Sequence, residues 1–295
     1  MSAQRDLADF LAAHDDSEEH VDRVMRSRLL YRNDANRIVV LMHGLTASPR
    51  SWKDFSHELH ETGTTVVVPR LPHHGHRERM TDALLELSEA QLDDFCDALV
   101  DAMVALDRPI TFVGHSLGGT LTLALAQRRP EIERAIALAP FLGIAQLPHQ
   151  FHKPAFTVVR RLPNFFLFWN PIDRETLGPS WGYPRYTSHA IAVGIAIADR
   201  LREDASARAH AAGHIDLVIN RSESSVNNRT VVDLARRWRT HPESRVSLHH
   251  LRGLPRSHDV IEPERRRPTA SRVLPIVRSL ILEPLPPSER RVHRI

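Results

Sequence analysis

The sequence predicts an α/β fold, with a mostly parallel, doubly wound sheet and an inserted helical cap. The first observation is a set of continuous apolar runs at 38–42, 64–68, 110–113 and 132–138, each followed by a helical or loop segment. Strands of a parallel sheet that is covered on both faces read in this way. The second observation is a break in the alternation over 142–210, where recurring prolines shorten the regular elements.

This break divides the chain into three expected parts. Residues 1–141 form the first part of the core, 142–210 form the inserted cap with one helix near 188–202, and 211–295 form the second part of the core. At 295 residues with 42% hydrophobic content, the chain is long enough to bury a full core.

The first part of the core opens with an amphipathic segment around Leu7 and Phe10. Runs at 27–32 and 37–42 look like strands, and the turn residues at 33–36 predict that they form a hairpin.

Helices follow at 49–63, where Ser48 can cap a helix that opens at Pro49, and at about 88–106. In the second part of the core, strands at 215–219 and 246–251 alternate with helices near 228–240 and 269–282, and we expect the tail after Glu283 to be loosely held.

Charge and composition argue against several classes of partner. The chain has 39 basic and 36 acidic residues, a net charge of +3, with no dense basic block on one predicted face, so we do not expect nucleic acid. The start lacks the apolar region of a secretory signal, and the longest apolar run, 190–198, is far short of the ~20 residues that span a bilayer. We expect a cytoplasmic protein with no stable membrane insertion. The single Cys96 says nothing about compartment.

A serine lies where the strand 110–113 meets the next helix, in Gly114-His115-Ser116-Leu117-Gly118-Gly119. Glycines at 114 and 118 remove Cβ atoms that would obstruct a sharp turn, and such a turn lifts the Ser116 hydroxyl above the carboxyl end of the strand. The segment therefore predicts a nucleophile.

A serine nucleophile needs a base and a carboxylate that orients the base. In a parallel sheet, both should follow later strands at the same edge as Ser116. The loop after 215–219 offers Glu223, and the loop after 246–251 offers His258, so the chain order is serine, acid, histidine. Asp216 lies at the opposite edge and Asp259 adjoins His258, which makes both poorer candidates for the acid.

These motifs together resemble the α/β-hydrolase superfamily, specifically its serine carboxylesterase and monoacylglycerol-lipase-like branch, over nearly the whole chain. Gly114 to Gly118 resembles the nucleophile elbow, and Ser257-His258-Asp259 is similar to the histidine loop. His43-Gly44-Leu45-Thr46 looks like the loop that supplies half of an oxyanion hole. The resemblance implies that the backbone amides of Leu45 and Leu117 hold the oxyanion. Glu223 departs from the aspartate most common in the family.

Several residues are candidates for contact with substrate. They are the histidines of the two loops and four aromatic residues of the expected cap, namely His43, His115, Phe165, Phe168, Trp169 and Trp181. For His43, bracing of the oxyanion loop is the alternative to substrate contact. The cap aromatics either line an apolar pocket or form the cap's own core, and contact with a lipid surface, helped by Arg160 and Arg161, is a third reading.

The sequence therefore predicts a serine hydrolase that cleaves a small, apolar carboxylic ester through an acyl-enzyme, with no cofactor and no metal. No acidic or cysteine partners accompany His73, His74 and His76, which disfavours a metal there. Thioester hydrolysis, acyl transfer, C–C bond hydrolysis and a catalytically silent binding protein remain alternatives. The oligomeric state is left open.

Overall fold

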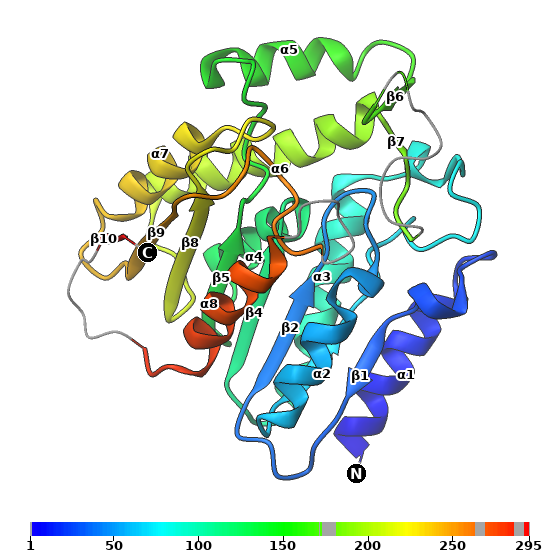
Figure 1. Ribbon diagram of the computed structural model, residues 1–295, viewed down its shortest axis with the longest axis vertical. Coiled ribbons are helices and arrows are strands. Elements are labelled where there is room, and N and C mark those ends of the chain that lie inside the picture. The colour runs from blue at the N-terminus through cyan, green and yellow to red at the C-terminus, as the bar shows by residue number, and fades with distance from the viewer. Residues whose placement is uncertain (1, 171, 173–180, 263–268, 286–291, 295) are drawn as a thin grey trace.

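A single large sheet runs through the middle of the molecule (Figure 1). The computed structural model describes residues 2–170, 172, 181–262, 269–285 and 292–294. Within them, the strand order is β1-β3-β2-β4-β5-β8-β9-β10, and β1 alone runs antiparallel to its neighbour. The strands are β1 (Arg28–Leu30), β2 (Ile38–Met42), β3 (Thr65–Val68), β4 (Ile110–His115), β5 (Ile132–Leu138), β8 (His214–Asn220), β9 (Val246–Leu251) and β10 (Val292–Arg294).

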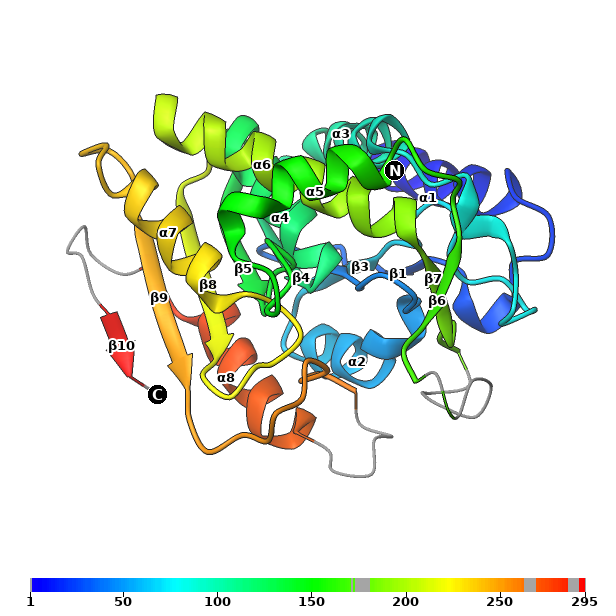
Figure 2. The same ribbon diagram turned by 90° about the horizontal axis from the view of Figure 1, so that it is seen from above.

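Helices cover both faces of this sheet (Figure 2). The helices are α1 (Ser2–Asp16), α2 (Lys53–Glu61), α3 (Glu89–Val104), α4 (Leu117–Arg128), α5 (His152–Val159), α6 (Ser188–Ala207), α7 (Asn228–Trp238) and α8 (Ala270–Leu282). Helices α2 and α8 bury their apolar residues on one face, and α1, α3, α4, α6 and α7 share a larger cluster on the other. The predicted α/β fold with a mostly parallel, doubly wound sheet is confirmed.

The expected hairpin between the first two strands is wrong. Strand β1 pairs antiparallel with β3, and β2 pairs parallel with β3 and β4, so β3 lies between the two strands that are neighbours in sequence. Turn residues between two strands permit a hairpin, but the crossover through α2 places β3 between β1 and β2. Ser48 also makes no side-chain capping bond to the short 3₁₀ turn Pro49–Trp52 that precedes α2.

Between β5 and β8 the chain leaves the sheet and forms α5, a two-stranded ribbon and α6. The ribbon pairs β6 (Phe166–Phe168) with β7 (Arg185–Thr187) in antiparallel register. Figure 1 shows α5 at the outer end of the molecule, beyond α6. Helix α6 buries residues such as Val193, Ile197 and Leu201 in the same cluster as α4, so it covers the sheet. The division of the chain at 142 and 210 into core and cap stays a prediction.

Part of the tail is paired with the sheet. Residues Val292–Arg294 form β10, which runs parallel to β9. The expectation of a loosely held tail otherwise falls on residues that lie largely outside the described ranges.

Candidate active site

Ser116 lies on a sharp turn between β4 and α4. Its backbone has φ 55° and ψ −118°, a conformation that costs energy for a residue with a Cβ atom. The turn is closely packed, because a Cβ on Gly114 would lie 2.1 Å from the carbonyl oxygen of Gly118. A Cβ on Gly118 would lie 2.4 Å from the carbonyl oxygen of Met42. Only glycine fits at these two positions, and α4 thereby begins directly against the end of β2.

The structure brings the serine, the histidine and the glutamate into one chain of hydrogen bonds. Nε2 of His258 lies 2.7 Å from Oγ of Ser116, and Nδ1 of His258 lies 3.0 Å from Oε2 of Glu223. A carboxylate only accepts, so Nδ1 carries the ring hydrogen and Nε2 is left to accept from the serine hydroxyl. This is the protonation state in which an imidazole can receive a proton from Ser116.

Glu223 is held as a buried carboxylate by its own loop. Its side chain has no exposed surface, and Oε1 accepts from the amides of Ser224 and Ser225 at 2.8 and 2.7 Å. Burial raises the pKa of this carboxyl, but the bonds from His258 and the two amides outweigh burial, so its pKa lies below the ordinary value. The side chain is therefore ionised at neutral pH.

The Glu223 loop is fastened to the segment that follows β5. Ile144 forms an antiparallel bridge with Val226, and the amide of Ala145 donates to the carbonyl of Ser225 at 3.0 Å. The amide of Asn227 donates to the carbonyl of Gly143 at 2.9 Å. These bonds fix the backbone of the loop that carries Glu223.

His115 braces the loop that carries His258. Its Nε2 lies 3.0 Å from the carbonyl oxygen of His258, and the two rings are 5.1 Å apart. Burial, with the neighbouring His258, lowers the pKa of His115 to about 4, so the ring is neutral and Nε2–H is the donor. This position favours support of His258 over contact with a substrate.

The loop after β2 passes beside the serine. A Cβ on Gly44 would lie 3.2 Å from Cβ of Ser116, so the backbone that carries the Leu45 amide is close to the nucleophile. Leu117 is the first residue of α4, and its amide has no partner within the helix. The two expected oxyanion donors thus lie on segments that flank Ser116.

His43 lies behind this loop and is fully buried. Its Nδ1 donates to the carbonyl of Gly44 at 2.9 Å, and its Nε2 accepts from the amide of Leu71 at 3.1 Å. Burial lowers the pKa of His43 well below its usual value, which keeps the ring neutral. With both nitrogens bonded to backbone, His43 is placed to brace the loop, the alternative to substrate contact.

The aromatic candidates are placed differently from one another. Phe165 and Trp169 are about half exposed, and Phe168 is half-buried in β6. Trp181 is buried, and the guanidinium of Arg50 lies 5.3 Å from its ring centre. Trp169 contacts the loop after β2, since its indole N–H donates to Oγ1 of Thr46 at 3.0 Å.

An apolar cluster that sequence reasoning missed adjoins the site. Its buried members are Ala139, Phe141, Ile191, Ile195 and Val226, and Leu45 packs against it. Ala139 and Phe141 follow the carboxyl end of β5, and Val226 comes three residues after Glu223. Position after a strand end was the available signal for these three, whereas nothing local marked the two residues of α6.

The histidines after β3 gain an acidic partner from far away in sequence. Glu18, just after α1, accepts from Nε2 of His76 at 3.0 Å and from the amide of His73 at 3.0 Å. Burial raises the pKa of Glu18, but these bonds and Arg70 outweigh it and hold the pKa well below its usual range. Across the described residues, no group of three or more His, Cys, Asp or Glu side chains is arranged to hold a metal ion.

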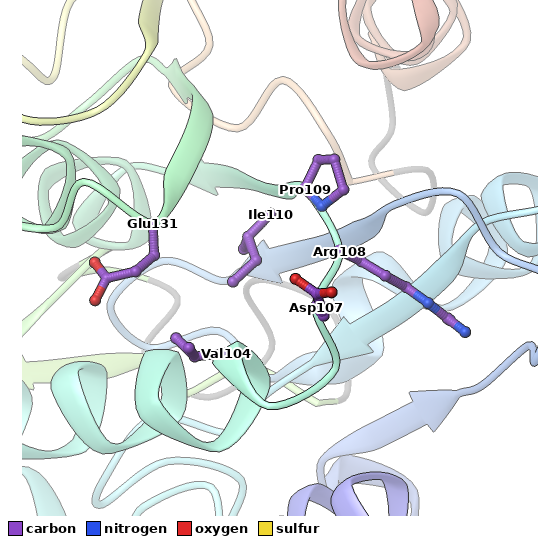
Figure 3. Close-up of a pocket in the computed structure, with 6 residues that line it drawn as sticks. All are labelled: Val104, Asp107, Arg108, Pro109, Ile110 and Glu131. Carbon is purple, nitrogen blue, oxygen red and sulfur yellow. The ribbon is translucent and has the colours of Figure 1, made fainter.

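Figure 3 shows a cavity at the amino end of β4. It has a volume of about 240 Å³, and its lining includes Asp107, Arg108 and Ile110 at the amino end of β4, together with Glu131. Because Ser116 follows the carboxyl end of β4, this cavity lies away from the candidate site. A larger, charged cavity of about 470 Å³ lies among residues of α6 and its neighbours, including Lys153, Arg202 and Arg237. Neither cavity contains a predicted site residue.

Comparison with known proteins assigns the fold to a family. Residues 39–284 match the Alpha/beta hydrolase family, so the chain belongs to that family. A thermostable monoacylglycerol lipase from Bacillus sp. (strain H-257) is 35% identical over 95 residues, which cover 32% of this chain and 36% of the lipase. A 2-hydroxymuconate semialdehyde hydrolase from Pseudomonas sp. (strain CF600) is 26% identical over 166 residues, which cover 53% of this chain and 56% of that enzyme.

These matches span less than two thirds of either curated relative. Among solved structures, the monoacylglycerol lipase of Paleococcus ferrophilus aligns with a TM-score of 0.64 at 17% identity, covering 86% of this chain and 97% of that one. At this identity the likeness shows the fold. Within the described residues, no helix combines the length and apolar character needed to cross a membrane.

Proposed function

We propose that this chain is a serine hydrolase that cleaves carboxylic esters of modest size and apolar character through an acyl-enzyme. The observation that carries the proposal is the hydrogen-bonded sequence from Ser116 through His258 to Glu223, at 2.7 and 3.0 Å. A base within reach of the hydroxyl, itself oriented by a buried carboxylate, is the arrangement that activates serine. The family membership and the lipase among the relatives support the same reading.

In the proposed reaction, Oγ of Ser116 attacks the acyl carbon while Nε2 of His258 takes its proton. His258 then gives that proton to the departing alcohol oxygen as the C–O bond of the ester breaks, which leaves an acyl-serine. A water molecule, deprotonated by His258, attacks the acyl-serine and releases the acid. Glu223 keeps the required tautomer and stabilises the imidazolium in both steps.

The amides of Leu45 and Leu117 hold the oxyanion in this proposal. Leu117 lies at the amino end of α4, where the helix dipole favours negative charge. Loss of one such donor costs about 2.7–4 kcal/mol of transition-state stabilisation in related sites.

The apolar cluster around Phe141, Ile191 and Val226 supports an apolar acyl or alcohol group, because Leu45 packs against it and so joins it to the oxyanion loop. The inserted segment, taken as the cap over residues 142–210, supplies part of this surface through α6.

The match to the Pseudomonas hydrolase favours a second candidate. That relative is named for 2-hydroxymuconate semialdehyde, and its match covers more of this chain than the lipase match does. The same three side chains can serve hydrolysis of a small acidic substrate of that kind, including cleavage of a C–C bond.

A fluorophosphonate probe tests the proposed nucleophile. The probe should label the wild-type protein covalently, Ser116→Ala should abolish labelling, and Ser17→Ala on the surface should retain it. Folded wild-type protein that stays unlabelled would overturn the proposal. Hydrolysis rates then separate the two substrate classes. They are measured for p-nitrophenyl esters of increasing acyl length and compared with the rate for 2-hydroxymuconate semialdehyde. A flat profile over acyl length contradicts the apolar-pocket assignment.

A further inference from the structure

Thr46 occupies an unusual backbone conformation immediately after Leu45. Its φ is 67°, in the left-handed region, which is unfavourable for a β-branched residue. The residue is buried, with 8% of its surface exposed. A conformation of this kind persists where surrounding contacts hold it in place.

Each polar group of Thr46 is bound by a residue from a distant part of the chain. Its amide donates to Nε2 of His74 at 3.3 Å, and its carbonyl oxygen accepts from the amide of Tyr183 at 2.7 Å. Its hydroxyl oxygen accepts from the indole N–H of Trp169 at 3.0 Å. The backbone and the side chain of Thr46 are therefore fixed together.

Two of these partners belong to the β6–β7 ribbon, one on each side. Trp169 follows β6, and its amide donates to the carbonyl of Pro184 at 3.1 Å, which continues the ribbon's ladder. The Trp169 ring also packs 4.2 Å from that of Tyr186 in β7. Tyr183 lies two residues before β7. Thr46 is therefore hydrogen-bonded to a residue next to each strand of the ribbon.

The third partner belongs to the loop after β3, and this loop is tied to the ribbon. The Tyr183 hydroxyl accepts from the amide of His76 at 2.9 Å and donates to the carbonyl of His73 at 3.2 Å. The rings of His74 and Tyr183 stack at 6.1 Å. His74 donates from Nδ1 to the carbonyl of Pro72, which leaves Nε2 free to accept from Thr46. The β6–β7 ribbon and the loop after β3 thus hold Thr46 together, and we call this pair of segments the clamp.

We propose that Thr46 is a positioning residue through which this clamp sets the direction of the Leu45 amide. The hydrogen bond from the Thr46 N–H to His74 fixes the peptide group that joins Leu45 to Thr46. Rotation of that peptide group would turn the adjacent one, which carries the Leu45 N–H. The inference rests on the proposed function, in which that N–H holds the oxyanion. The bond from Trp169 makes the inserted segment part of the oxyanion site.

Loss of the clamp therefore lowers the rate of the chemical step without weakening substrate binding. A misdirected donor is lost mainly to the transition state, where charge develops on the oxygen, so kcat falls and KM stays nearly constant.

A double-mutant cycle with p-nitrophenyl butyrate tests this inference. Trp169→Phe removes the N–H and keeps an aromatic ring, and Thr46→Val removes the accepting hydroxyl and keeps the branched shape. Each single variant is expected to lower kcat about tenfold with KM within about twofold. The double variant should be no slower than the slower single variant, because both changes break one bond. Thr46→Ser, which restores the hydroxyl, should regain most of the kcat lost in Thr46→Val.

The fluorophosphonate reaction, run on every variant, counts the folded and reactive protein so that kcat is given per labelled Ser116. Additive losses in the double variant would overturn the inference, as would a rise in KM at constant kcat or a Thr46→Ser variant as slow as Thr46→Val. Wild-type protein that neither labels nor hydrolyses esters would overturn the proposed function itself. Normal labelling without coupling between Thr46 and Trp169 overturns the positioning role alone.

Discussion

Oε2 of Glu223 lies 3.0 Å from Nδ1 of His258, although 35 residues separate the two in sequence. Glu223 follows β8 and His258 follows β9, and these strands are parallel neighbours in the sheet. The carboxyl ends of parallel neighbours meet at one edge, so the two loops are brought together by strand pairing.

Glu223→Gln is expected to lower kcat by about 10³- to 10⁴-fold with little change in KM, by analogy with the loss of a triad carboxylate. The amide keeps the shape of the side chain, but it cannot stabilise the imidazolium, and its NH₂ group favours the wrong tautomer of His258. Steady-state hydrolysis of a p-nitrophenyl ester measures the effect. Glu243→Gln, at an exposed site, serves as the matched control. A rate near that of the wild type would place the acid elsewhere.

His115→Leu is expected to lower kcat about tenfold, because the carbonyl of His258 loses its donor and the His258 loop loses a fixed position. His115→Gln can place an N–H near the position of Nε2 and should recover most of the rate. Comparison of kcat for the two variants, with melting temperatures to check folding, tests the bond. Equal rates in both variants would argue against it.

Acid should destabilise the fold between about pH 6.5 and 4. Burial lowers the pKa of His14, His74, His115 and His210 to about 4, and holds that of His43 well below its ordinary value. Between the unfolded value of 6.5 and the folded value, the unfolded state binds more protons. The free energy of unfolding therefore falls as the pH falls through this range.

Urea unfolding at pH 7 and at pH 4 measures this loss. His210→Gln removes one of the buried histidines. Between pH 7 and pH 4, the free energy of unfolding of this variant should therefore fall by up to about 3 kcal/mol less than that of the wild type. A pH dependence identical to that of the wild type would mean that His210 does not stay neutral on folding.

Arg70→Met is expected to cost about 3–5 kcal/mol of unfolding free energy, because it leaves two carboxylates buried without their partner. The Arg70 side chain is fully buried, with Nε 3.0 Å from Asp15 and one terminal nitrogen 2.8 Å from Glu18. The triple variant that adds Asp15→Asn and Glu18→Gln removes all three charges and should recover part of the loss. Urea unfolding compares the two. A single variant as stable as the wild type would contradict this account.

Much of the sheet could be predicted from the sequence. The sequence predicts the strands at 132–138 and 246–251 at their observed bounds, because a buried parallel strand appears as one continuous apolar run. The pairing of β1 could not be predicted in this way, since local turn residues do not report which strand arrives between two others. Register and order depend on crossovers that the helices determine.

The meeting of Ser116, Glu223 and His258 follows from their positions after β4, β8 and β9, and their roles stay predictions. The contacts of Thr46 and Arg70 could not be found from sequence, although Thr46 lies in the segment His43-Gly44-Leu45-Thr46 that resembles an oxyanion loop. Each is defined by partners more than 25 residues away, such as Trp169 for Thr46 and Asp15 for Arg70. Contacts of that range are visible only once the fold is known.

The buried Arg70 pairs with two carboxylates that precede the region matched to the family. The shared region begins at residue 39, whereas Asp15 and Glu18 lie before it and Arg70 lies within it. Arg70 also donates to the carbonyl of His74, whose ring receives the Thr46 amide. A fragment that begins at residue 39 would lack Asp15 and Glu18, and it would expose the Arg70 guanidinium that the full chain buries. The segment before residue 39 therefore helps to hold the backbone next to Leu45, whose amide binds the oxyanion in the proposed function.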